Sequence, residues 1–122
     1  MPRMGPILLA VDHRGSAVGA IDAAAELARE RGVAVEVLIV GDTVVRSTDG
    51  WEETAEQVAA TLRARGVTAT ATLRHGVPAD VILERAGEID AALIVLGSTS
   101  RAVATRSPLP VLVVPQSSTR PS

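Results

Sequence analysis

The stretch Pro6-Ile-Leu-Leu-Ala-Val-Asp12 decides the fold of this chain. It is a continuous apolar run of strand length, which is typical of a strand buried on both faces, as in a parallel sheet. The pattern then becomes helical from residue 16 to residue 31. One face of this predicted helix carries Val18, Ile21, Ala25 and Ala28. A buried strand followed by an amphipathic helix is the repeating unit of parallel α/β domains.

The same unit recurs along the rest of the chain. Further strands are predicted at residues 34–40, 67–74, 91–96 and 111–114. Residues 67–74 alternate between threonine or arginine and apolar side chains, which indicates a half-exposed strand at a sheet edge. Five strands alternating with four helices predict an α/β fold, a doubly wound five-stranded parallel sheet with helices on both faces. We expect a single domain over residues 1–115 and a disordered polar tail over residues 116–122.

Local signals predict where the helices begin and end. Ser16 is placed to cap the first helix, and Gly32 suits a left-handed residue just past its end. Asp49 and Glu52 have the spacing of a capping box at the start of the second helix, which stops at Gly66. Pro78 is expected at the first position of the third helix.

Composition excludes several classes of function. The chain has no cysteine, and all twelve of its basic residues are arginine, so thiol chemistry, disulfides and lysine-based catalysis are excluded. The net charge is −2 and Trp51 is the single aromatic residue, which argues against nucleic acid as a partner. No apolar run reaches the ~20 residues of a membrane span, and the N-terminal run is too short for a signal peptide. We therefore expect a cytoplasmic protein without a membrane partner.

In doubly wound sheets, ligands bind outside the carboxyl ends of the strands where the strand order reverses. The residues to consider are therefore 12–15, 41–42, 75–76 and 97–100. A phospho-acceptor receiver site needs an acidic cluster and a lysine that are missing here, and a flavodoxin site needs aromatic side chains. A Rossmann dinucleotide site needs three close glycines at the first turn, and the spacing of Gly15 and Gly19 does not provide them.

The chain resembles the universal stress protein family over nearly its whole length. Four segments carry this resemblance in the right order, namely 7–12, 76–83, 89–98 and 107–114. The second segment, Gly76-Val-Pro-Ala-Asp-Val-Ile-Leu83, is similar to the family's Gly-x-Pro-Ala-x-x-Ile-Leu motif. The resemblance implies the strand order 3-2-1-4-5. It also implies a homodimer, because members of this family commonly pair the fifth strand with its two-fold mate.

In members that bind ATP, the aspartate that ends the first strand holds the adenosine end, and a glycine loop after the fourth strand wraps the phosphates. The resemblance therefore implies these nucleotide-binding residues: Ala10, Val11, Asp12, Val40, Gly97, Ser98 and Thr99. The chain departs from the family pattern after Gly97, because no glycine follows it. A single Gly-Ser pair stands where the family has two, so we expect weak ATP binding, with Arg101 or Arg106 adding charge for one phosphate.

These observations favour a non-catalytic regulatory or stress-response protein with weak or no ATP binding and no required cofactor. The alternative is an adenine-nucleotide module that binds ATP or AMP, with the short loop favouring AMP. A nucleotide hydrolase is the third hypothesis, but His13 and His75 lie in separate loops and no nucleophile–base pair is evident. We expect no metal site. We expect a homodimer through the fifth strand, and the identity of any further protein partner stays open.

Overall fold

A computed structural model describes residues 5–12, 18–41, 50–97 and 101–114. Nine elements alternate along the chain: β1 (Ile7–Val11), α1 (Val18–Arg31), β2 (Val35–Gly41), α2 (Trp51–Ala64), β3 (Ala69–His75), α3 (Pro78–Glu88), β4 (Leu93–Leu96), α4 (Arg101–Arg106) and β5 (Val111–Val113). Within these residues, no helix is long and apolar enough to cross a membrane.

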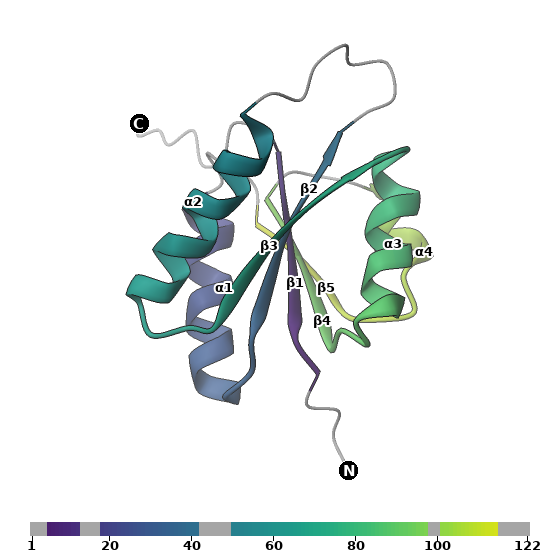
Figure 1. Cartoon of the computed structure of the whole chain (residues 1–122). Coiled ribbons are helices and arrows are strands. Elements are labelled where there is room, and N and C mark those ends of the chain that lie inside the picture. The colour runs from purple at the N-terminus through teal and green to yellow at the C-terminus, as the bar shows by residue number, and fades with distance from the viewer. Residues whose placement is uncertain (1–4, 13–17, 42–49, 98–100, 115–122) are drawn as a thin grey trace, which may run out of the picture.

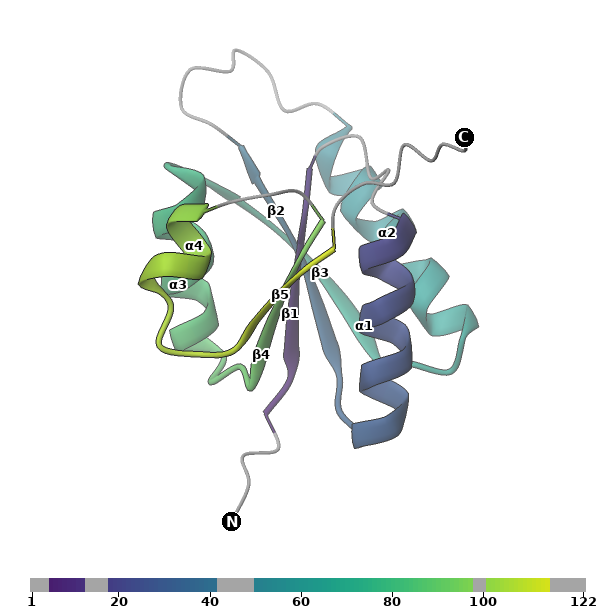
Figure 2. The same cartoon turned by 180° about the vertical axis from the view of Figure 1, so that it is seen from behind.

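The five strands form one parallel sheet in the order β3-β2-β1-β4-β5. Helices α1 and α2 cover one face, and α3 and α4 cover the other (Figure 1; Figure 2 shows the same arrangement from behind). The predicted doubly wound fold is confirmed, together with its strand order and the edge position of the third strand.

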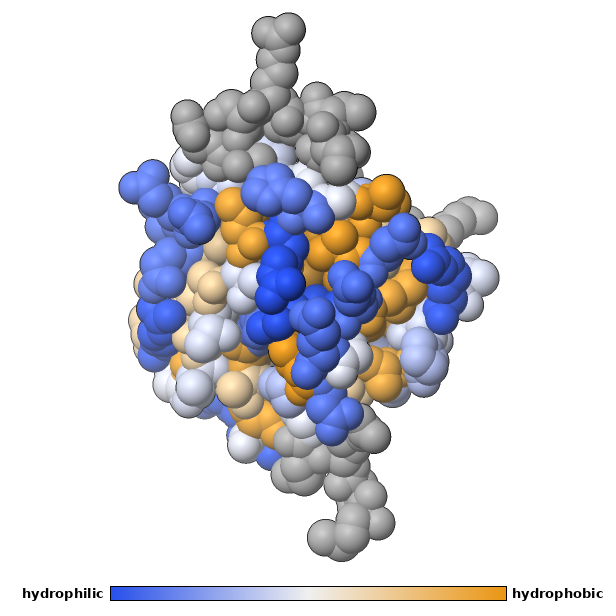
Figure 3. Space-filling model, turned by 45° about the vertical axis from the view of Figure 1, so that its right-hand side comes forward, coloured by the Kyte–Doolittle hydropathy of each residue, from blue (hydrophilic) through white to orange (hydrophobic). Residues whose placement is uncertain are grey.

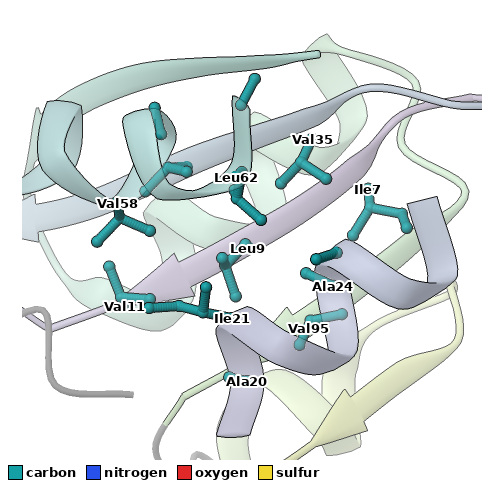
Figure 4. Packing of buried hydrophobic residues seen from close by; sticks show 14 of the residues in the cluster. Ile7, Leu9, Val11, Ala20, Ile21, Ala24, Val35, Val58, Leu62 and Val95 are labelled. Carbon is teal, nitrogen blue, oxygen red and sulfur yellow. The ribbon is translucent and has the colours of Figure 1, made fainter. Parts of the chain in front are cut away.

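β1 lies in the centre of the sheet, and its side chains alternate between two apolar layers. Ile7, Leu9 and Val11 pack with α1 and α2, and Figure 4 shows Ile21 and Val58 pointing toward this row. The other layer, under α3 and α4, consists of Leu8, Ala10, Leu38, Ile82, Ala86, Ala91, Ile94, Leu96 and Val103. Because both faces of β1 are buried, its sequence is apolar at every position.

Most of the predicted helix boundaries are confirmed. Gly32 and Gly66 follow their helices with φ of 67° and 84°, and Pro78 stands at the start of α3. The predicted capping box is wrong, because the N-cap of α2 is Gly50 with φ of 85° and no side-chain cap. A glycine takes this left-handed position easily, and its carbonyl accepts the Thr54 amide at 3.0 Å. Ser16 and Asp49 lie outside the described residues.

Two further expectations are corrected. Val18 does not share the buried face of α1, because it is 64% exposed in the first turn of the helix. The third and fourth strands begin two residues later than predicted, at Ala69 and Leu93. The amides of Val67 and Ala91 instead bond back to carbonyls in the preceding helices, at 3.1 and 2.9 Å. Residues 116–122, expected to be a disordered tail, lie outside the described part of the chain.

Candidate functional site

A pocket of about 200 Å³ opens at the carboxyl ends of the central strands. Its lining residues come from β1 and its end, from β2 and β4, and from the first turns of α3: Ala10, Val11, Asp12, Val40, Pro78, Ile82 and Leu96. The strand order reverses between β1 and β4, and both strands contribute to the wall. The pocket therefore lies at the topological switch point where ligands of such sheets bind.

Hydrogen bonds hold the strand ends that frame this pocket. The Gly97 amide, just after β4, donates to the Ala10 carbonyl of β1 at 3.0 Å. The Gly76 amide, just after β3, donates to the Gly41 carbonyl at the end of β2 at 2.9 Å. Because parallel strands end at the same edge, these bonds extend the sheet to the rim of the pocket.

Gly76 also sets the direction in which α3 begins. Its φ is 144°, a conformation that L side chains rarely adopt, and a Cβ atom there would lie 2.8 Å from Cγ2 of Val81. The chain can therefore turn closely over Val81 only with glycine at this position. This turn brings Pro78 and Ile82 to the pocket wall.

Four of the predicted binding residues come together at this pocket, namely Ala10, Val11, Asp12 and Val40. Gly97 is hydrogen-bonded to Ala10 beside it, whereas Ser98 and Thr99 lie outside the described residues. Whether these residues contact a ligand stays a prediction.

Three wall residues were missed by the sequence analysis: Pro78, Ile82 and Leu96. Pro78 belongs to the family-like motif at 76–83, so that motif was a usable signal for it. Ile82 and Leu96 read as core residues in the sequence, and they are indeed buried at 6% and 2% exposure. An apolar side chain that borders both core and pocket has no distinguishing pattern.

The electrostatics of the pocket are simple. Asp12 is the one titratable group among its described lining residues, and it is half-buried at the pocket wall. Arg106, which the sequence suggested as a charge for a phosphate, donates to Asp80 of α3 at 2.8 Å. No group of three or more His, Asp or Glu side chains suited to a metal ion occurs in the described residues. The arrangement suits binding of a mostly apolar group with a polar edge that meets one carboxylate.

A charged network that the sequence did not reveal holds α3 on the sheet. Arg85 donates to both carboxylate oxygens of Glu36 on β2, from Nε at 2.5 Å and from Nη2 at 2.9 Å. It also donates to Glu88 at 2.9 Å, and Arg74 of β3 lies 3.8 Å from the same carboxylate. The hydrogen bonds that Arg85 donates to Glu36 and Glu88 raise the pKa of Arg85 above its ordinary value. Figure 3 views the side of the molecule that carries α3, where a band of hydrophilic side chains runs between hydrophobic ones.

The family model described as the universal stress protein family matches residues 4–101. A universal stress protein from Archaeoglobus fulgidus in complex with dAMP is 32% identical, with a TM-score of 0.78 over 93% of this chain and 98% of that chain. Another structure of a universal stress protein from that organism is 29% identical, with a TM-score of 0.79 over 89% and 97% of the two chains.

A third similar structure is a universal stress protein family protein from Arabidopsis thaliana with AMP bound. It is 15% identical, with a TM-score of 0.75 over 93% of each chain, and this likeness shows the fold alone. The search of curated proteins found no match.

Proposed function

Because this chain belongs to the universal stress protein family, we propose that it is a non-catalytic regulatory protein that binds an adenine mononucleotide in preference to ATP. The observation that carries this proposal is the pocket at the switch point, with Asp12 in its wall. The ligand is an AMP-type molecule whose adenosine part enters this pocket. Binding reports the level of the nucleotide, and we place this function in the cytoplasm.

A related structure supports the choice of ligand. The Archaeoglobus fulgidus protein, which is 32% identical over almost its whole length, was solved with dAMP. In our proposal the Asp12 carboxylate accepts hydrogen bonds from the adenosine end of the ligand. The side chains of Val40, Pro78 and Ile82 pack against its apolar surface.

The length of the β4–α4 connection supports a mononucleotide over a triphosphate. β4 ends at Leu96 and α4 begins at Arg101, and Gly97 is the last glycine of the chain. A triphosphate needs several backbone amides at close range, and each such bond to a charged phosphate contributes about 1.5–3 kcal/mol. Losing two or three of them weakens binding by about a hundredfold or more.

The same chemistry supports a role without turnover. Hydrolysis of a phosphoanhydride bond of ATP needs a positioned nucleophile or water and groups that stabilise the developing charge. Asp12 is the one titratable group that the described lining residues contribute. We therefore expect an ATPase assay to give the blank rate, for the native chain and for Asp12→Ala alike.

Calorimetric titration tests the proposed function. We expect AMP to bind at least about tenfold more tightly than Mg-ATP, and Asp12→Ala to weaken AMP binding by about tenfold. Asp22→Ala is the matched control, because Asp22 is an exposed carboxylate on α1. An ATP dissociation constant below about 10 µM, corresponding to roughly −7 kcal/mol, would overturn the argument from the short loop. Equal AMP binding by Asp12→Ala would show that the nucleotide site lies elsewhere.

We further propose a homodimer through β5. Its register leaves the N–H and C=O groups of Val111 and Val113 directed away from β4, because Pro110 and Val114 bond to Ile94 and Leu96. The strand is wholly apolar, and Leu112 is 37% exposed. Antiparallel pairing with a two-fold mate satisfies these edge groups and closes the assembly. Light scattering should give about twice the 12.6 kDa chain mass; a monomer at high micromolar concentration would contradict the pairing.

A further inference from the structure

β3 is the other edge of the sheet, and its register shows which backbone groups face outward. The Val35 amide of β2 donates to the Thr68 carbonyl, and the Gly76 amide donates to the Gly41 carbonyl. With Val37 opposite Ala71 and Ile39 opposite Leu73, the even-numbered residues of β3 therefore bond to β2. The N–H and C=O groups of the odd-numbered residues point away from the sheet.

The fold itself satisfies only the beginning of this edge. Nε of Arg63, from the last turn of α2, donates to the outward carbonyl of Ala69 at 3.0 Å. The same guanidinium pairs with Glu56. In the described part of the chain, no group is placed in this way on the outward N–H and C=O of Ala71 and Leu73. This stretch of the edge is open to a further strand.

A groove runs alongside the open stretch. It has a volume of about 330 Å³ and lies between β3 and the first half of α2. Its walls are Ala71, Thr72 and Leu73 on one side and three glutamates, Glu52, Glu53 and Glu56, with Ala55 on the other. Arg63 neutralises Glu56, while no ion pair joins Glu52 or Glu53 to another described residue. The groove therefore combines strand-pairing groups, apolar contact and negative charge.

We propose that the β3 edge and this acidic groove form a docking site for an extended peptide segment of another protein, with basic side chains at alternate positions. The peptide adds a strand to the sheet by bonding to the backbone of Ala71 and Leu73. Every second side chain of an added strand points to the same face, so its basic residues meet Glu52 and Glu53. Main-chain bonds give this partner its affinity, and the glutamates select its charge.

Charge complementarity favours a basic peptide over a second copy of the chain at this site. A second copy of the chain placed edge to edge would bring its own Glu52 and Glu53 toward the same residues, which like-charge repulsion opposes. Glutamates beside an edge can also serve only to prevent unwanted strand pairing. In that case neither the basic nor the acidic peptide would bind.

The test uses a defined probe, the labelled peptide acetyl-Thr-Arg-Val-Arg-Val-Arg-Thr-amide, titrated with the full chain at low salt. We expect saturable binding by fluorescence anisotropy, and NMR amide shifts centred on Ala71 and Leu73. Two control peptides separate charge from pairing: one has glutamate in place of arginine, and the other is N-methylated at alternate residues. Both should lose binding by about tenfold or more.

A matched pair of variants completes the test. Glu52→Lys with Glu53→Lys should weaken the arginine peptide by about tenfold, while Glu26→Lys with Glu30→Lys on exposed positions of α1 should leave it unchanged. All four positions are exposed, so these variants are expected to fold. The proposal is overturned by no binding at millimolar peptide, by equal binding of the N-methylated peptide, or by equal loss with both variants.

Discussion

The two edges of the sheet differ in length, in chemistry and in what holds them to the rest of the molecule. β3 has seven residues, of which Thr70, Arg74 and His75 are exposed, whereas β5 has three residues, all apolar. On the β3 side, α3 is fastened to the sheet by the charged network of Arg85. On the β5 side, Val103 of α4 and Leu109 join the apolar layer under α3 and α4. Hydrogen-bonded ion pairs are directional and select for charge, whereas apolar contacts do neither. These differences are the reason for proposing a charged peptide at the β3 edge and a second copy of the chain at the β5 edge.

The largest effect is expected from breaking the charged network. Arg85→Met leaves Glu36 in the sheet, 8% exposed, without its cation, which should cost about 3 kcal/mol of unfolding free energy in a denaturant titration. Arg29→Met, on an exposed stretch of α1, should cost less than about 0.5 kcal/mol. The double variant Glu36→Leu with Arg85→Met should recover most of the loss, because no buried charge then remains. Equal stability of Arg85→Met and Arg29→Met would show that the network contributes nothing on the β3 side.

A somewhat smaller effect is expected at the turn that ends β3. Gly76→Ala forces a side chain into a φ of 144° and against Val81, which should cost about 2 kcal/mol and weaken AMP binding through the displaced α3. Gly87→Ala, within α3, is the control, since a Cβ there meets no atom within 4 Å. It should gain up to about 1 kcal/mol. A neutral Gly76→Ala would mean that the turn does not position the pocket wall.

Arginine substitutions on the two edge strands should differ in their effect on the dimer. Leu112→Arg places a charge on the exposed side chain of β5 and should raise the dimer dissociation constant by about tenfold or more, through charge repulsion and desolvation at the two-fold axis. Thr70→Arg makes the matched change on an exposed position of β3. It should leave the mass in sedimentation equilibrium unchanged. If Thr70→Arg and not Leu112→Arg yields monomers, the assignment of the two edges is reversed.

The smallest effect is a difference in salt response. Raising the salt concentration from about 0.1 to 1 M shortens the screening length from about 10 to 3 Å. We expect this to weaken the arginine peptide at the β3 groove severalfold and to leave the β5 dimer unchanged. Anisotropy and light scattering on the same samples measure both. A dimer that dissociates in salt would indicate charged contacts that the apolar β5 does not supply.

The parts of the fold that could be predicted are those where burial determines the residue pattern directly. β1 is covered on both faces and is therefore apolar throughout, while β3 is an edge and alternates. The strand order came from the family resemblance, because periodicity cannot rank parallel strands. Local capping signals were less reliable: Gly50 with its positive φ took the position assigned to Asp49, and Val18 proved exposed at the helix start.

Four of the seven residues that line the pocket are among the predicted binding residues. Asp12 and its neighbours follow from the rule that ligands meet strand ends, and the family-like motifs locate them. Ile82 and Leu96 could not be separated from core residues, because a pocket wall and a core demand the same side chains. The bond between Glu36 and Arg85 joins residues 49 positions apart in the chain. No local pattern indicates which distant arginine a strand glutamate will meet.

The central position of β1 also determines when the chain can fold. Ile7 pairs with Val35 on one side and with Leu93 on the other, so β1 completes its pairing only when β4 has emerged from the ribosome. At ~5–20 residues per second, this leaves Leu8 and Leu9 without their final cover for roughly ten seconds. Nascent chains with such a delay are exposed to aggregation and to chaperones, and sheets with distant pairings fold slowly. The central place of β1 therefore makes the interval between the synthesis of Ile7 and that of Leu96 decisive for the yield of native protein.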